Sequence, residues 1–314
     1  MNVSSPSQNG SLLSSRDSYN DAVIKNFIVI ALGLTINYIN GTLIHTFRKH
    51  QILYANPRYV LFIHLVINDM IHLTTVVTLF VTSYVLQKIN GTLCCIIISF
   101  AIFTTQNSPL NLAVMALQCY ITICFPLRHS EICTMKRTYI AIGWIWAMSS
   151  IAILPDICLV VAMDYGKLFT STIYCERDNL LRHPVSKTKR DVLYSIYLVV
   201  IWIVLFYTYL HIFFAAKAAR SDGDLKKARN TILLHGFQLL LCILTYVYHL
   251  IVRLLVYLFP RNYLHVIFVS YIFIQMLPRF VSPIVYGVRD QLFRQKLKKH
   301  LFCGFCFKTR LAGF

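Results

Sequence analysis

The chain has 314 residues, of which 57% are hydrophobic and only 13% are charged. Because a soluble domain has about 25% charged residues, this composition excludes an ordinary soluble enzyme or binding domain and indicates a membrane protein. The net charge of +18 is concentrated in segments expected to face the cytoplasm, which indicates anionic membrane lipids, and not nucleic acid, as its partner.

Seven apolar stretches follow one another with short connections, and each reaches the roughly 20 residues that a membrane-crossing helix needs. We therefore expect an all-α membrane protein, a seven-transmembrane helix bundle at 24–288. An extracellular tail at 1–23 precedes it, and a cytoplasmic amphipathic surface helix with a tail at 289–314 follows it. The expected spans cover residues 24–47, 59–84, 93–126, 138–163, 192–216, 230–259 and 263–288.

The polar N-terminal tail carries two glycosylation sequons, at Asn2 and Asn9. We expect glycans there if the tail is outside, although such triplets also arise by chance in a segment rich in serine and asparagine. Further sequons lie at Asn90, close to a span, and at Asn40, inside the first span, where we expect no glycan.

Two charged residues lie at bilayer depth, Asp69 in the second span and Arg279 in the seventh. Such a charge costs several kcal/mol unless it has a partner. Helical spacing places Arg279, Ser282 and Tyr286 on one face of the last span. Both charges are therefore expected to have partners inside the bundle.

Three separate motifs resemble the signatures of one family. The third span ends in MALQCYITICFPLRH at 115–129, the sixth begins with Lys227, Thr231 and His235 at fixed spacing, and the seventh ends in SPIVY at 282–286. In this order they resemble the motifs of odorant receptors, of the fish type, in the rhodopsin-like class of G-protein-coupled receptors. The resemblance covers the chain from residue 40 to about residue 293.

The resemblance implies a receptor that binds a small, water-soluble, polar or anionic odorant in the outer half of the bundle. Helical faces and register bring a set of candidate ligand-binding residues to this region, and each of them could instead be ordinary helix packing. They are Ile102, Thr105, Gln106, Tyr197, Tyr246, His249, Arg253 and Gln275.

The resemblance also implies a polar network within the membrane, made of Asn40, Asp69, Arg279, Ser282 and Tyr286. In the family the face that carries Arg279 looks across at Asp69, near which many related receptors hold a sodium ion. We hypothesise that Arg279 pairs with Asp69 and displaces sodium. The alternative is that Arg279 points elsewhere, toward carbonyl groups or water.

The cysteines divide between the two sides of the membrane. Cys94 matches the family cysteine that is bonded to the second outer loop, where Cys175 is its natural partner, with Cys95 as a rival. Cys303 and Cys306, after the amphipathic helix, are either palmitoylation sites or simple thiols.

A heterotrimeric G protein, of the olfactory type, is the intracellular partner that the resemblance implies. Gln118 and Cys119 replace the acid and the arginine that the family uses for this coupling, so the alternative is a ligand-binding protein with weak, atypical or no coupling. The residues expected to face the G protein are Gln118, Cys119, Tyr120, Tyr209, Lys227 and His235.

Other classes of membrane protein find little support. An intramembrane metalloprotease needs an HExxH motif and a transporter usually has an internal repeat, and the sequence has neither. We therefore expect no enzymatic activity, no cofactor and no metal site.

Overall fold

The computed structural model describes residues 19–86, 88–175, 177–181, 184–218, 237, 240, 244, 247, 248, 251, 252, 254–281 and 295. Within these residues six helices are long and apolar enough to cross a membrane. The expected sixth span, at 230–259, and the amphipathic helix lie largely outside the described residues. The expectation of a helical transmembrane bundle is confirmed.

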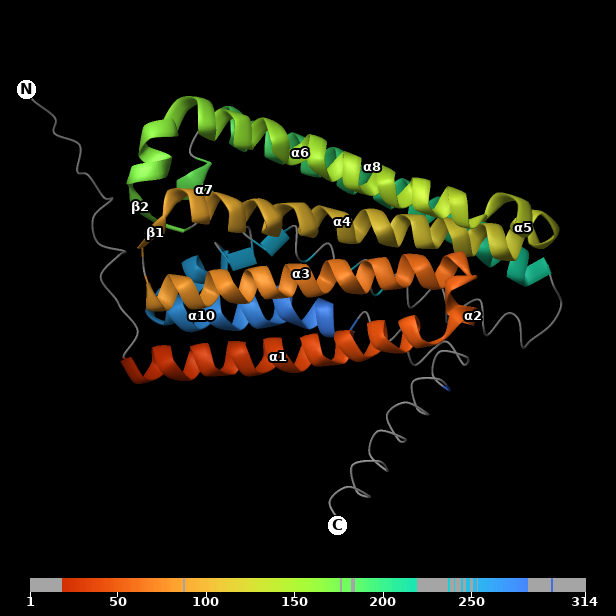
Figure 1. Ribbon diagram of the computed structural model, residues 1–314, viewed down its shortest axis with the longest axis horizontal. Helices are drawn as coiled ribbons and strands as arrows, with labels where there is room; N and C mark the ends of the chain where they lie inside the picture. Colours follow the sequence, from red (N-terminus) through yellow and green to blue (C-terminus); the bar gives the residue numbers. More distant parts are fainter. Residues whose placement is uncertain are drawn as a thin grey trace, which may run out of the picture.

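The long helices run side by side along the molecule (Figure 1). In chain order they are α1 (Tyr19–Lys49), α3 (Pro57–Val85), α4 (Gly91–Cys124), α6 (Met135–Thr170), α8 (Pro184–Ala218) and α10 (Tyr263–Tyr271). Helix α10 continues through a wider turn, η3 (Ile272–Met276), so that the last described span reaches Val281. Helix α4 packs against α3, α6 and α8 and is therefore the centre of the bundle.

Polar caps and prolines, more than hydropathy, set the ends of α3 and α4. The Asn56 side chain accepts a hydrogen bond from the Arg58 amide at 3.0 Å, and Pro57 occupies the first turn of α3. Asn90 caps α4 in the same way. The expected third span ran to Pro126, but α4 ends at Cys124, because Pro126 disfavours helical dihedral angles at the residue before it, and Phe125 is indeed non-helical.

Helices α6 and α8 are longer than their expected spans, 138–163 and 192–216. Hydropathy detects only the part that crosses hydrocarbon, whereas a helix can extend beyond it into water. At the inner end, short helices α2 (Gln51–Tyr54), η1 (Pro126–Arg128) and α5 (His129–Ile132) connect the long ones.

A small hairpin and a disulfide bond close the outer end of the bundle. Strand β1 (Lys88–Asn90) pairs antiparallel with β2 (Thr172–Tyr174). The predicted disulfide bond joins Cys94 at the start of α4 to Cys175 just after β2, and Cys95 is a buried free thiol. The short helix α7 (Arg177–Leu180) follows, with η2 (Pro260–Asn262) on the other outer connection.

Candidate functional site

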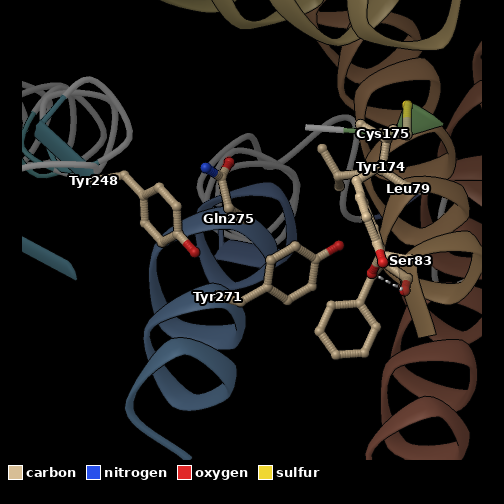
Figure 2. Close-up of a pocket in the computed structure, with 9 residues that line it drawn as sticks. Leu79, Ser83, Tyr174, Cys175, Tyr248, Tyr271 and Gln275 are labelled. Atoms are coloured by element: carbon tan, nitrogen blue, oxygen red, sulfur yellow. Dashed lines mark hydrogen bonds between the residues drawn. The ribbon is translucent and has the colours of Figure 1, made fainter. Parts of the chain in front are cut away.

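A cavity of about 400 Å³ opens at the outer end of the bundle. Figure 2 shows Tyr248, Tyr271 and Gln275 on one side of it, facing Leu79, Ser83 and Tyr174 on the other. The hydroxyl of Tyr271 and the side-chain oxygen of Gln275 are buried without a hydrogen-bond partner among the described residues. The cavity thus combines apolar walls with polar groups that a bound molecule can satisfy.

A smaller cavity of about 170 Å³ adjoins the first and lies deeper beside α4. The two share the wall formed by Val76, Leu79, Cys175 and Gln275. The polar residues of the smaller cavity come from five separate elements of the chain, and they are His72, Thr105, Arg177, Tyr194 and Gln275.

The residues that we predicted to bind a ligand are only partly brought together. Ile102, Thr105 and Gln275 line the smaller cavity, and Gln106 is buried nearby in α4 with an unpaired amide oxygen. Tyr197 requires a correction: its hydroxyl donates to the Met148 carbonyl at 3.1 Å, so its side chain lies against α6. The register along α8 alone could not reveal this contact, because the rotation of α8 about its axis relative to α6 depends on how the two helices pack. Tyr246, His249 and Arg253 lie outside the described residues.

Reasoning from the sequence missed several cavity residues, among them His72, Arg177, Tyr194, Tyr248 and Tyr271. Arg177 follows Cys175 by two residues, so the disulfide motif was a usable signal for its position. His72 follows Asp69 by one helical turn, which was a second signal.

An ion pair between Asp69 and Arg279 lies at the centre of the bundle, below the smaller cavity. The Nη1 atom of Arg279 is 2.8 Å from Asp69 Oδ1 and donates to Ser108 Oγ at 2.8 Å, and Ser108 in turn donates to Asp69 at 3.2 Å. Asp69 and Arg279 are 1% and 3% exposed. The hydrogen bonds among Asp69, Ser108 and Arg279 therefore join α3, α4 and the last described span.

Asn40 does not take part in these hydrogen bonds. It is fully buried, and neither side-chain nitrogen nor oxygen reaches a partner among the described residues. Ser282 and Tyr286, the other expected members of the network, lie outside the described residues.

Further amides and hydroxyls extend the network toward α6. Asn68 donates to the Thr104 carbonyl and to Ser108 Oγ, both at 2.9 Å, and it accepts from Asn107 at 3.2 Å. Ser149 in α6 donates to Asn107. These residues were not predicted, although the recurrence of polar residues at helical spacing in α4 was a signal.

The inner end of α4 presents an aromatic cluster. The Tyr120 ring makes edge contacts with Phe125, Tyr207 and His211 at centroid distances of 5.7, 6.0 and 5.7 Å. Cys119 packs beside Ile212 of α8.

The other residues expected at this inner end are buried or lie outside the described chain. Gln118 is 7% exposed with a buried, unpaired amide oxygen, and Tyr209 packs among apolar residues with a buried hydroxyl. Lys227 and His235 lie outside the described residues, as do the modification candidates Asn2, Asn9, Cys303 and Cys306.

Comparisons with known proteins all match the same class of receptor. Residues 39–286 match the family described as 7 transmembrane receptor (rhodopsin family). The chain is 29% identical to Odorant receptor 131-2 of Danio rerio, over 88% of this chain and 85% of that protein. It is 25% identical to Olfactory receptor 51B2 of Homo sapiens, over 88% and 89% of the two chains. It is also 21% identical to human Olfactory receptor 11L1, over 92% and 91%.

Proposed function

The chain belongs to the rhodopsin family of seven-transmembrane receptors, and from this we propose that it is an odorant receptor signalling to a heterotrimeric G protein. The ligand is a small, water-soluble, polar or anionic odorant. The observation that carries the proposal is the pair of adjoining cavities beneath the disulfide-anchored loop, together with the names of the matched relatives.

The cavities have the size and lining of a small-molecule site. Such sites have volumes of about 300–1,000 Å³ and apolar walls with a few polar groups that orient the ligand. The larger cavity alone, at about 400 Å³, falls in this range. Its position at the end of the bundle that carries the disulfide bond suits a ligand that arrives from outside the cell.

The orientation in the membrane follows from charge and disulfide chemistry. Basic residues gather at the end of the bundle opposite the disulfide bond, for example Arg48, Lys49 and Arg137, and basic loops stay in the cytoplasm. Disulfide bonds form in oxidising, extracellular surroundings. We therefore place the protein in the plasma membrane with its N-terminus outside.

The second candidate function is capture of the ligand with weak, atypical or no coupling. It is favoured by one observation: the positions where the family has an acid and an arginine hold the buried Gln118 and Cys119, which packs beside Ile212. Neither side chain carries a charge that could engage a G protein.

Cyclic AMP measured in cells that display the receptor separates the two functions. The receptor is compared with a Gln118→Asp/Cys119→Arg variant, with and without a pool of water-soluble odorants. A ligand-dependent rise in the unmodified receptor supports coupling without the arginine. A rise only in the variant supports ligand capture with poor coupling. No response in either, with surface display shown and no odorant bound by the purified protein, would refute the odorant-receptor proposal.

A further inference from the structure

We infer that Arg177, in the loop between α6 and α8, binds the carboxylate group of an anionic ligand in the smaller cavity. This inference rests on the proposed receptor function and names the chemical class of its ligand.

The backbone of Arg177 is held from both sides. Two residues before it, Cys175 is bonded to Cys94 of α4. After it, Leu180 and Leu181 are buried in an apolar cluster with Ile98 of α4. A loop residue held in this way can present its side chain at a defined position, as a binding residue must.

The guanidinium group of Arg177 is oriented by Tyr194, and among the described residues no carboxylate neutralises it. Its Nη2 atom donates to the Tyr194 hydroxyl at 2.8 Å, and its central carbon lies 5.3 Å from the centroid of the Tyr194 ring. Its Nε atom is buried and has no hydrogen-bond partner among the described residues, and none of their carboxylates pairs with it. An arginine has five N–H donors in a planar fork, and among the described residues the Nε donor of Arg177 has no partner.

The electrostatic surroundings favour an anion. The described lining of the smaller cavity contains the positively charged Arg177 and no acidic residue. Two nearby buried acids already have basic partners: Asp69 pairs with Arg279 at 2.8 Å and Asp156 with Lys189 at 2.7 Å. An anion entering the cavity would therefore meet the positive charge of Arg177 without an opposing carboxylate in the described lining.

The groups around Arg177 fit a carboxylate with a short alkyl chain. The arginine fork binds a planar carboxylate through two parallel hydrogen bonds. Thr105 and Gln275 are further polar groups in the same lining, and Gln275 has an unpaired oxygen for a protonated or hydroxylated ligand. The shared apolar wall at Val76 and Leu79 leads into the larger cavity, which would take the alkyl chain. An amino acid fits less well, because the described lining has no acid for its ammonium group.

The test measures binding directly, so that it does not depend on coupling. Receptor in lipid nanodiscs is titrated with hexanoate, with its neutral analogue hexanamide and with zwitterionic 6-aminohexanoate, and the rise in melting temperature gives the affinity of each. We expect hexanoate to bind, and hexanamide to bind at least about tenfold more weakly, because it loses one charge-assisted hydrogen bond. We expect 6-aminohexanoate to bind at least about tenfold more weakly as well, because its ammonium group would enter a described lining that has no acidic partner for it.

Three variants connect this selectivity to the side chain. Arg177→Gln is expected to weaken hexanoate binding at least about tenfold and to leave hexanamide binding unchanged. Arg177→Lys should give an intermediate loss, because lysine supplies charge but no fork. Lys88→Gln is the matched control: it removes an exposed positive charge of the same outer end, over the Tyr174 ring, and should change nothing.

Several results would overturn the inference. They are no binding of hexanoate by the unmodified receptor, equal binding of hexanoate and hexanamide, or full hexanoate affinity in Arg177→Gln. If Arg177→Gln does not fold, Arg177→Lys decides, and unchanged selectivity in it counts against the inference. Binding of neutral odorants from the pool without binding of hexanoate would overturn only this inference. Failure of the whole pool would overturn the proposed function.

Discussion

Removing either charge of the Asp69–Arg279 pair should strongly destabilise the receptor. The closest atoms are 2.8 Å apart, which corresponds to about 6 kcal/mol of attraction at an effective dielectric constant of about 20, before the desolvation of both charges is subtracted. Since each side chain is almost fully buried, a single substitution leaves one unpaired charge, and the expected cost is about 3–5 kcal/mol. This is a large fraction of a typical stability of about 5–15 kcal/mol.

A double-mutant cycle measures this interaction. Asp69→Asn, Arg279→Gln and the double variant are compared with the unmodified receptor by surface display and by melting temperature in nanodiscs. We expect each single variant to lose display, and the double variant to recover part of it, because no charge is then left alone. The exchanged pair, Asp69→Arg with Arg279→Asp, is a stricter test of the same contact. Strictly additive losses in the cycle would refute the pairing argument.

Three further predictions follow from the same bundle. Replacing sodium by choline should leave the melting temperature of the unmodified receptor unchanged, because Arg279 holds the position beside Asp69; a sodium dependence would contradict this. Gly33→Ala should lower the stability of the receptor by about 1–3 kcal/mol, because the new methyl group would lie 2.9 Å from a Val77 methyl carbon. In the control variant Gly143→Ala the new methyl group meets no atom within 4 Å, so its effect on stability should be neutral or favourable. Equal melting temperatures for the two variants would show that α1 can move away from α3. Cys175→Ser should lower the stability of the receptor by about 2–5 kcal/mol. It should also abolish hexanoate binding, since the loop that carries Arg177 is no longer bonded to α4. Retained binding would show that the buried Leu180 and Leu181 are enough to hold Arg177 in position.

Much of the architecture could be predicted from the order of residues alone. Long apolar stretches without charges must form helices in a bilayer, because no water is present to satisfy the backbone. The described spans therefore follow from hydropathy. The resemblance to the receptor family implied the disulfide bond between Cys94 and Cys175 that the structure contains, with Cys95 left open as a rival. The lone charges Asp69 and Arg279 required partners for the same reason, and the structure brings them within hydrogen-bond distance of each other.

The tertiary structure decided which side chains meet at the cavities. Hydropathy and helical register describe one helix at a time, so they could not show that Tyr197 lies against α6. For the same reason they could not show that His72 of α3 and Tyr194 of α8 line the same cavity as Thr105 of α4. They also could not place Arg177, because it lies in the short connection between α6 and α8, and its position depends on a disulfide bond and on the burial of Leu180 and Leu181 against α4. The sequence by itself therefore determined that the chain crosses the membrane as helices and which charges needed partners. Contacts between helices, which depend on packing over the whole bundle, determined where a ligand can bind.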